Sequence, residues 1–358
     1  MINLNQFLID INFFSLYIIM NKFLVCSYNN FDILAHNVKG NKSHIPMAII
    51  KESILESNLE CINPAFAVRR GNFIYVCCES INDGYILTID LKTLKILKKV
   101  SSCGKSSCYL EIDNEDKYII NINYWDSIIT VHPIIDNILE EATQVILPEK
   151  KNKIHTIDDH LIDRQKTSHH HSCAFYKEDL YVPDLGTDRI DIYSYKNGNL
   201  RFKNYIELPK KSGPRYIIFI NNFLYVINEL SSSIIVIKMS PKPHIIQNIG
   251  TIPVDIKIKN TCGTIKYNKL GYIYASNRGH NSICTFKILN NNLLKLVNIQ
   301  STFGKTPRHF EINDDCSKLY VANQDTNEVI IFKIIENKLK IIDTIKYNSP
   351  NFILSLND

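Results

Sequence analysis

A repeat of about 44 to 51 residues runs through most of this 358-residue chain and restricts what it can fold into. Each repeat contains a run rich in Val and Ile, and these runs begin near Leu24, Tyr75, Ile120, Tyr181, Tyr225, Tyr274 and Tyr320. A period in this range is typical of four-stranded propeller blades. The interval from Ile120 to Tyr181 is about 15 residues longer than the others, which predicts an inserted loop at about residues 148–167.

Four short strands follow one another in a constant order within a repeat. In one repeat the expected strands are 216–220, 223–227, 233–238 and 244–249, and in another they are 308–312, 318–322, 328–334 and 338–345. Ile, Val, Tyr and Phe are plentiful and Ala is sparse, which favours strands over helices. Evenly spaced short strands joined by Asn, Asp and Gly turns predict an all-β repeat architecture.

The two ends of the chain predict how the array closes. The first strand-like run, 22–26, has the character of a second strand, whereas the last run, 350–355, resembles the first strand that begins at Pro214. Pairing the two ends would complete a seventh blade and leave no open sheet edge. We therefore predict an all-β, seven-bladed β-propeller whose last blade is closed by a C-terminal strand. Two stacked sandwiches would explain neither the period nor the split blade.

Residues 20–358 are expected to form this single propeller domain, and residues 1–19 an extension outside the fold. The segment 7–20 is apolar but contains Asp10 and Asn12, and it has neither a basic start nor a small-residue cleavage site. It is therefore a poor signal peptide and too short to cross a bilayer. The sequence leaves open whether translation starts at Met1 or at Met20. We expect a cytoplasmic monomer that does not bind membranes.

Charge and cysteine content bound the remaining function classes. The net charge of +5 is spread along the chain and no recognition motif accompanies it, so nucleic-acid binding is not expected. The ten cysteines include no C-x-x-C pair and several lie in strand-like runs, which predicts buried free thiols. Only the run His169 to His171 approaches metal-ligand spacing, and no acidic or Cys partner is spaced to complete a metal shell. We expect neither a metal nor a cofactor.

Propeller geometry predicts where the chemistry lies. Adjacent strands in a blade are antiparallel, so the start of strand one and the end of strand two share one end of the blade. The first-strand starts contribute Lys105, His171, Arg215 and Arg308. The second-strand ends contribute Glu79, Tyr124, Asp184, Glu229, Arg278 and Gln324. With strand one innermost, these side chains meet at one mouth of the channel, and their mixture suits binding an anion and moving a proton.

Motifs at these same positions resemble a known family. They are His169 with His171-Ser, Val182-Pro-Asp-Leu-Gly, Asp188-Arg-Ile, Gly213-Pro-Arg, Val226-Ile-Asn-Glu-Leu, Ser276-Asn-Arg-Gly-His and Val321-Ala-Asn-Gln-Asp. In this order they resemble the lactonase family of seven-bladed propellers, which includes 6-phosphogluconolactonases and carboxymuconate-cyclising enzymes. The resemblance runs from about Met20 to the C-terminus. It implies the opening or closing of a lactone ring that carries an anionic group.

The resemblance also implies which residues act. The histidine, two arginines and glutamate of the cyclising members fall on His171, Arg215, Arg278 and Glu229. Two positions depart from the family pattern: Tyr216 stands where a histidine is usual, and Ser168 where a proline is usual. The first change would alter how the substrate fits.

Individual roles follow from side-chain chemistry. His171 is the expected general acid or base, while the arginines would clamp an anion and stabilise an oxyanion. Glu229 would either hold an arginine or share the proton transfer. The expected substrate-binding residues are His169, Asp184, Arg308, Gln324 and Lys105, and Arg164 of the insertion could also reach a phosphate. Asp188, Asn281 and Asn327 recur at one loop position, so they are expected to lock the blades.

The leading functional prediction is hydrolysis of 6-phosphoglucono-δ-lactone, a small anionic lactone, as in the pentose phosphate pathway. The alternatives are a muconate-type cycloisomerase and a propeller that serves as a non-catalytic binding platform. The fold does not decide among them, because propellers support many functions.

Overall fold

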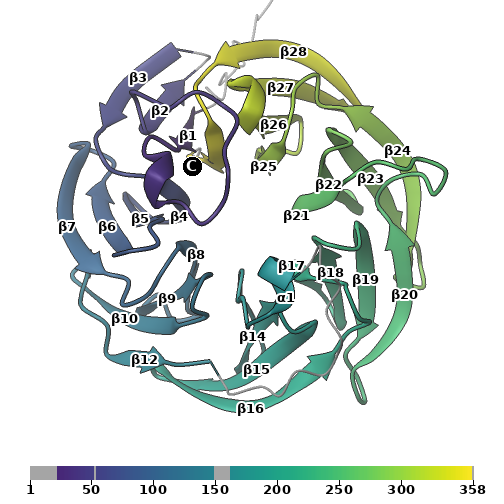
Figure 1. Ribbon diagram of the computed structural model, residues 1–358, viewed down its shortest axis with the longest axis horizontal. Coiled ribbons are helices and arrows are strands. Elements are labelled where there is room, and N and C mark those ends of the chain that lie inside the picture. The colour runs from purple at the N-terminus through teal and green to yellow at the C-terminus, as the bar shows by residue number, and fades with distance from the viewer. Residues whose placement is uncertain (1–21, 52–53, 149–161, 357–358) are drawn as a thin grey trace, which may run out of the picture.

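The computed structural model describes residues 22–51, 54–148 and 162–356, and these residues form seven sheets arranged in a ring (Figure 1). The first three blades, from the innermost strand outwards, are β29 (Pro350–Ser355), β1 (Lys22–Ser27), β2 (Met47–Lys51) and β3 (Ile54–Leu59); β4 (Pro64–Arg70), β5 (Phe73–Cys78), β6 (Tyr85–Asp90) and β7 (Lys95–Ser101); and β8 (Ser107–Ile112), β9 (Tyr118–Asn123) and β10 (Ile129–Ile135), with the short β11 (Ile138–Leu139) and β12 (Gln144–Ile146) both paired to β10.

The other four blades each contain four strands in chain order from the centre outwards. They are β13 (Ala174–Tyr176), β14 (Asp179–Asp184), β15 (Arg189–Lys196) and β16 (Asn199–Glu207); β17 (Pro214–Ile220), β18 (Phe223–Asn228), β19 (Ser233–Lys238) and β20 (His244–Gly250); β21 (Thr261–Asn268), β22 (Tyr272–Arg278), β23 (Ser282–Ile288) and β24 (Leu294–Ser301); and β25 (Pro307–Ile312), β26 (Lys318–Asn323), β27 (Glu328–Ile335) and β28 (Lys338–Lys346).

The ring closes by pairing of the two chain ends. The C-terminal strand β29 runs antiparallel to β1, with Ile353 opposite Val25 and Leu354 opposite Leu24. The predicted seven-bladed all-β propeller with a split blade is therefore confirmed. The assignment of residues 1–19 to an extension stays a prediction, because it lies outside the described residues. The same holds for the part of the insertion at 149–161.

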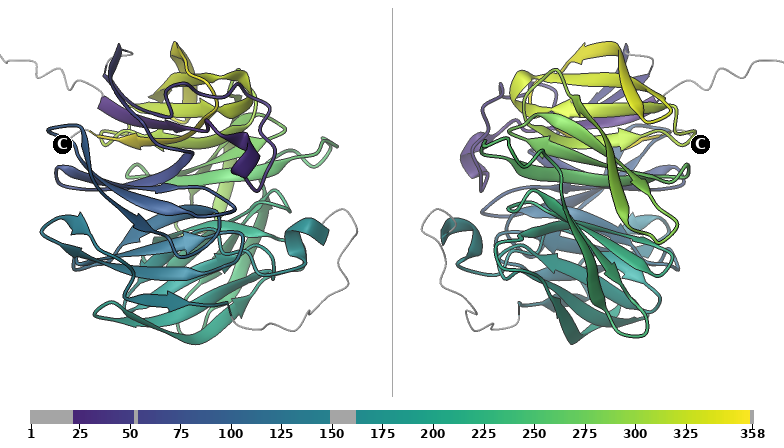
Figure 2. Two further views of the ribbon diagram at one scale, coloured as in Figure 1. Left: turned by 60° about the vertical axis from the view of Figure 1, so that its left-hand side comes forward. Right: turned by 90° about the vertical axis from the view of Figure 1, so that its right-hand side faces the viewer.

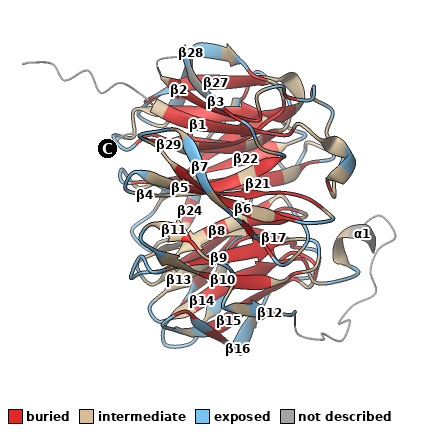
Figure 3. Cartoon of the chain, turned by 90° about the vertical axis from the view of Figure 1, so that its left-hand side faces the viewer, coloured by how far each residue is buried: buried red, intermediate tan, exposed pale blue. Residues whose placement is uncertain are grey.

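The apolar core lies between blades. The second strand of a blade is covered on both faces, and five consecutive residues are buried in both β5 and β18. Between neighbouring blades, Leu224 and Val226 of β18 pack with Tyr181 and Ile192 of the preceding blade. The outermost strands, such as β28, are largely exposed (Figure 3). Burial of one blade against the next therefore holds the ring together.

The cysteines behave as core residues. All ten are free thiols, and seven of them are buried. Burial raises the pKa of the Cys77 and Cys78 thiols well above the ordinary value, so neither is a ready nucleophile.

Hydrogen bonds from one loop position link three of the blades to the blade that follows. Asp188, Asn281 and Asn327 all adopt left-handed backbone, with φ of 55°, 56° and 58°. Their side chains accept hydrogen bonds from backbone amides that precede the following blade: Asp188 from Gly213 (2.7 Å), Asn281 from Thr306 (2.9 Å) and Asn327 from Ser349 (3.1 Å). The predicted blade-locking role is confirmed.

Two further segments cover one end of the ring. The long loop 28–46 between β1 and β2 contains the 3-10 turn η1 (Phe31–Ile33), and the short helix α1 (Ile162–Gln165) precedes β13. Both lie on the same face of the disc (Figure 2). A second 3-10 turn, η3 (Gln324–Thr326), follows β26. None of the helices in the described part of the chain is long and apolar enough to cross a membrane.

Candidate active site at the channel mouth

A β-bulge at the start of the innermost strand brings one side chain to the mouth from each of five blades. In β17 the pairing with β18 passes from Pro214 directly to Tyr216, which leaves Arg215 out of the ladder. The same irregularity leaves out Ala65, Cys108, Arg308 and Asn351 in their blades. An extra residue in a bulge re-aims its side chain. His171 lies beside the bridge between His170 and Asp184, at the matching place in its blade.

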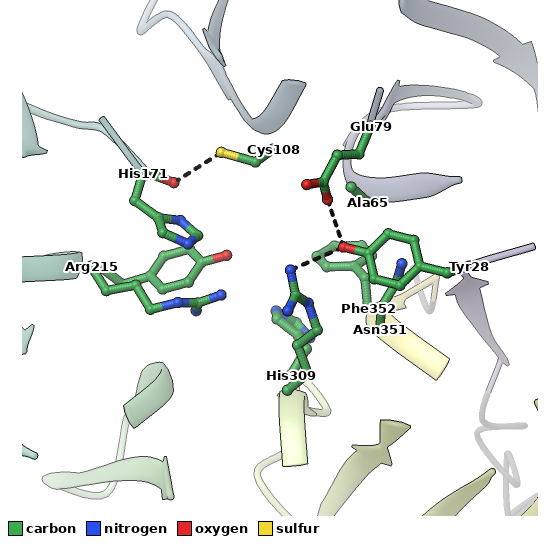
Figure 4. Close-up of a pocket in the computed structure, with 11 residues that line it drawn as sticks. Tyr28, Ala65, Glu79, Cys108, His171, Arg215, His309, Asn351 and Phe352 are labelled. Atoms are coloured by element: carbon green, nitrogen blue, oxygen red, sulfur yellow. Dashed lines mark hydrogen bonds between the residues drawn. The ribbon is translucent and has the colours of Figure 1, made fainter. Parts of the chain in front are cut away.

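These bulge residues meet around one small cavity (Figure 4). Its volume is about 20 Å³, room for roughly one water molecule. It is lined by Tyr28, Ala65, Glu79, Cys108, His171, Arg215, Tyr216, Arg308, His309, Asn351 and Phe352. His171 and Arg215 lie on one side of the cavity, and Glu79 and Tyr28 on the other (Figure 4).

An aromatic layer crosses the channel one residue further along the innermost strands. Phe66 packs against Tyr109 and Phe352, with ring centroids 4.3 and 4.5 Å apart. The His309 ring is tilted against Phe352 with centroids 4.4 Å apart, and the Tyr216 ring lies 5.5 Å from Tyr109. This layer gives the cavity an apolar floor, and a water-poor setting strengthens the electrostatic interactions above it.

Three arginines surround one buried carboxylate beside the cavity. Glu229, which is 2% exposed, follows β18. Its Oε2 lies 2.9 Å from Arg215 Nε and 2.7 Å from Arg278 Nη2, and its Oε1 accepts a hydrogen bond from Arg164 Nη2 at 2.5 Å. Burial alone would raise the pKa of Glu229, but the three guanidiniums outweigh it and hold the pKa well below the ordinary value. The group therefore carries a surplus of two positive charges.

The arginines are held in place by further contacts. Arg215 Nη1 donates to the carbonyl oxygen of Gly263 at 2.7 Å, and Arg278 Nη2 donates to that of Cys262, also at 2.7 Å. Burial lowers the pKa of Arg278 to about 10, which still leaves it charged at neutral pH. Arg164 comes from α1 and also donates through Nε to the Tyr124 hydroxyl at 3.2 Å. The insertion thus contributes a charge to the site.

His171 is a neutral imidazole in this setting. Burial, followed by the nearby Arg215 charge, holds the pKa of His171 well below its ordinary value. Its Nδ1 has no hydrogen-bond partner among the described residues. The ring packs against Tyr124 and Tyr216, with centroids 5.1 and 5.6 Å away. A neutral imidazole with an unused nitrogen can accept a proton.

A second carboxylate faces the cavity from the opposite wall. Glu79 Oε2 accepts a hydrogen bond from the Tyr28 hydroxyl at 2.7 Å, and Arg308 Nη2 donates to the same hydroxyl at 3.0 Å. His36 of the loop 28–46 places its Nδ1 3.7 Å from Glu79 Oε1. The predicted mouth residue Arg308 therefore belongs to this second group rather than to the arginines around Glu229.

The structure thus brings together His171, Arg215, Glu229 and Arg278, with Arg308 across the cavity, but it separates the other candidates from them. Asp184 is fully buried and holds the loop before β13: its oxygens accept from the Ser168 hydroxyl (2.6 Å) and the His169 amide (2.8 Å). Its place in the blade matches Asn228, one residue before Glu229. Successive strand residues point to opposite faces of the sheet, so Asp184 and Glu229 do not occupy equivalent positions. Asp184 does not line the cavity, and its contact with substrate stays a prediction.

Three further candidates lie outside the cavity. Lys105 is exposed in the loop before β8, three residues ahead of the bulge residue Cys108. Both ring nitrogens of His169 are engaged, Nδ1 with the carbonyl of Tyr124 and Nε2 with the hydroxyl of Thr167, each at 3.2 Å. Gln324 is buried after β26 and does not line the cavity. Substrate contact by these three stays a prediction.

The expectation that the histidine run has no acidic partner was wrong, because two aspartates lie beside His170 in the folded chain. His170 is fully buried, with Nε2 3.1 Å from Asp191 Oδ2 and 4.0 Å from Asp184 Oδ2. However, its Nδ1 bonds the carbonyl oxygen of Ser127 at 3.0 Å, so both ring nitrogens already have protein partners. The group has the contacts of a structural histidine–aspartate pair that anchors the loop.

Sequence reasoning missed Tyr28 and His36, and it named Arg164 only as a possible phosphate contact. Tyr28 directly follows β1, as Glu229 follows β18, so the rule for second-strand ends applied to the first blade would have found it. His36 and the close contact of Arg164 with Glu229 depend on how two long loops fold back, and no periodic signal marks them.

The fold and this mouth define a closed seven-bladed propeller with a buried cationic site, and comparison with known proteins gives its family. The model of the lactonase family, described as a seven-bladed β-propeller, matches residues 51–354. The chain belongs to this family. The Bacillus subtilis 6-phosphogluconolactonase is 28% identical over 294 residues, which cover 75% of this chain and 82% of that protein. An uncharacterized Staphylococcus epidermidis protein is 26% identical over 81% of this chain and 87% of its own length.

Solved structures show the same architecture. The Pseudomonas aeruginosa periplasmic gluconolactonase superposes with a TM-score of 0.80 at 18% identity, covering 94% of this chain and 99% of that chain. A putative 6-phosphogluconolactonase from Bacteroides fragilis superposes with a TM-score of 0.79 at 25% identity, covering 96% and 99%.

Proposed function

We propose that this chain is a carboxylic ester hydrolase that opens a lactone bearing an anionic group, with 6-phosphoglucono-δ-lactone as the leading substrate. One observation carries the proposal: a neutral imidazole with an unused nitrogen, His171, shares a cavity with Arg215, part of a buried group with two surplus positive charges. Family membership and the similarity to 6-phosphogluconolactonases support it. The enzyme would act as a cytoplasmic monomer in the pentose phosphate pathway and need no cofactor.

The hydrolysis divides between a base and an anion-binding group. His171 removes a proton from water as the water oxygen bonds to the lactone carbonyl carbon, and the carbonyl electron pair moves onto its oxygen. Arg215 stabilises that oxyanion. When the tetrahedral intermediate collapses, the bond to the ring oxygen breaks and the protonated His171 returns its proton to the leaving oxygen. Such base catalysis contributes roughly 10²- to 10⁴-fold, and an oxyanion donor about 10²- to 10³-fold.

Glu229 holds the arginines rather than moving protons in this scheme. A carboxylate whose pKa is held well below its ordinary value by three guanidiniums is a poor proton acceptor near pH 7. Arg164 and Arg278, which contact Glu229 together with Arg215, would bind the anionic substituent. A phosphate there would gain charge-assisted hydrogen bonds, which are about twice as strong as neutral ones.

Turnover of defined lactones by the purified chain tests the proposal. Hydrolysis of 6-phosphoglucono-δ-lactone, followed by acid release in a pH-stat and corrected for the spontaneous rate, should exceed background by several orders of magnitude. No hydrolysis together with turnover of a carboxymuconate would reverse the assignment to a cycloisomerase. A chain that turns over neither and retains a protein partner in pull-down would be a binding platform.

A further inference from the structure

The backbone of His171 is held by hydrogen bonds, but its ring is not. The His171 amide donates to the carbonyl oxygen of Pro183 at 3.2 Å, and its carbonyl oxygen accepts from the Cys108 thiol at 3.5 Å. In the described part of the chain, Nδ1 of the imidazole is buried without a hydrogen-bond partner, and no carboxylate bonds to the ring. Catalytic bases are commonly oriented by a hydrogen bond to a third group. The orientation of this ring therefore has another source.

Two aromatic rings enclose the imidazole. The Tyr124 ring meets it edge-on, at 63° with centroids 5.1 Å apart, and the Tyr216 ring is tilted by 47° at 5.6 Å. Both distances fall in the range of about 4.5–7 Å that aromatic pairs prefer. Tyr124 follows β9 in the preceding blade, and Tyr216 belongs to β17 in the following blade. The two neighbouring blades thus confine the imidazole between them.

Tyr124 is itself fixed by its surroundings. Its hydroxyl accepts a hydrogen bond from Arg164 Nε at 3.2 Å, and its amide donates to the carbonyl oxygen of Ser106 at 2.8 Å. The His169 ring stacks on the Tyr124 ring, with centroids 4.9 Å apart and 18° between the planes. Both nitrogens of His169 are engaged, so its ring is fixed as well. His169 therefore supports Tyr124 from outside the cavity lining.

Tyr216 is fixed between an arginine and the aromatic layer. Cζ of Arg215 lies 4.6 Å from the Tyr216 ring centroid, and the Tyr109 ring lies 5.5 Å away. Arg215 is held in turn by Glu229 and by the carbonyl oxygen of Gly263. The Tyr216 ring therefore sets the base against the arginine that would stabilise the oxyanion.

We propose that Tyr124 and Tyr216 form an aromatic clamp that positions the His171 base in place of a hydrogen-bonded carboxylate, with His169 supporting the clamp through Tyr124. These three are positioning residues, because they act through His171. A carboxylate partner would raise the pKa of the imidazole, whereas aromatic rings exclude water without adding charge, which fits the low pKa of His171. The inference rests on the proposed lactone hydrolysis, since it concerns the base of that reaction.

Removal of the Tyr124 ring tests the clamp, because this residue does not line the cavity. Tyr124→Leu should lower kcat for 6-phosphoglucono-δ-lactone by about 10- to 100-fold and change KM by less than about threefold, since misplacement of a group by about 1 Å can cost about 10²-fold. Tyr124→Phe keeps the ring and loses only the hydroxyl bonded to Arg164, so its kcat should stay within about threefold of wild type. Tyr216→Leu and Tyr216→Phe should follow the same pattern.

A background without the base separates positioning from damage to the fold. Tyr124→Leu should reduce the residual rate of His171→Ala by less than about twofold, because the clamp acts through His171. An equal loss in the two backgrounds, or a Tyr124→Phe protein as slow as Tyr124→Leu, would overturn the inference. If thermal melting shows that Tyr124→Leu does not fold, His169→Ala replaces it; this variant removes the stacked support of Tyr124 and should lower kcat about 3- to 10-fold.

The inference stays testable if the proposed function fails. Nuclear magnetic resonance of histidine-labelled protein follows the His171 ring through a pH titration without substrate, and the absence of its signal in His171→Ala assigns it. Burial is the largest cause of the low pKa of His171, and the charges that face the ring, on Arg215, Glu229 and Arg308, are retained in the Tyr124 variants. The titration midpoint should be at least about half a pH unit higher in Tyr124→Leu than in wild type, and unchanged in Tyr124→Phe. Equal midpoints in Tyr124→Leu and wild type would refute the clamp.

Discussion

Replacing Glu229 by Gln removes the carboxylate charge that lies among Arg164, Arg215 and Arg278 while keeping the shape of the side chain. The carboxylate oxygens lie 2.5 to 2.9 Å from guanidinium nitrogens, and both Glu229 and Arg215 are 2% exposed. Breaking a buried pair by removing one partner costs about 3–5 kcal/mol, and here three positive charges would be left facing one another. We expect the free energy of unfolding of Glu229→Gln to fall by at least that amount.

The same variant should bind anions. Without Glu229, sulfate can occupy the space between the arginines, and an anion at 100 times its Kd would restore about 2.7 kcal/mol. Urea denaturation at low ionic strength, repeated along a sulfate titration, measures both effects. The control is Glu328→Gln. Glu328 Oε2 lies 2.7 Å from Nζ of Lys346, whose side chain is 77% exposed, so loss of this ion pair should lower the free energy of unfolding by only about 0–1 kcal/mol. A Glu229→Gln protein as stable as this control, and equally insensitive to sulfate, would refute the electrostatic reasoning.

Three other predictions follow from single residues. Burial and the Arg215 charge hold the pKa of His171 below its ordinary value, so the base stays unprotonated as the solution is acidified. The acidic fall in the pH profile of kcat/KM should therefore have its midpoint below pH 6.5, and a midpoint at or above pH 6.5 would contradict this. Burial raises the pKa of Glu111 from 4.5 to about 8, so between these pH values the folded state binds a proton that the unfolded state does not, and the free energy of unfolding falls as pH rises. Glu111→Gln lacks this titration, so its free energy of unfolding relative to wild type should rise by roughly 2–3 kcal/mol from pH 6 to pH 9, measured by urea denaturation. Asp184→Asn should cost about 1–3 kcal/mol of stability by weakening the loop before β13, with KM changed less than kcat.

The architecture could be predicted from sequence because the repeat carries it. Each blade must bury its second strand on both faces, so the Val- and Ile-rich runs recur at a fixed period, and the first-strand pattern of β29 revealed the split blade. The mouth followed from the antiparallel order of strands. This placed His171, Arg215, Glu229 and Arg278 together without any knowledge of side-chain contacts.

The differences between the expected and the observed arrangement of the site have two physical origins. A shift of one residue along a strand reverses the face, which is why Asp184 was counted with Glu229 although it matches Asn228. The other origin is the loops. The β-bulge in β8 directs the side chain of Cys108, rather than that of Lys105, toward the cavity, and no sequence pattern marks this bulge. Arg164 reaches Glu229 because α1 folds back over the mouth.

Hydrolysis of 6-phosphoglucono-δ-lactone by wild type and His171→Ala, measured side by side at neutral pH, tests the central claim most directly. The account predicts a loss of roughly 10²- to 10⁴-fold in kcat, with the remaining rate due to the arginines. His280→Ala serves as control, since this histidine follows β22 outside the cavity lining and should leave kcat within about twofold. Equal rates above background for wild type and His171→Ala would contradict the account.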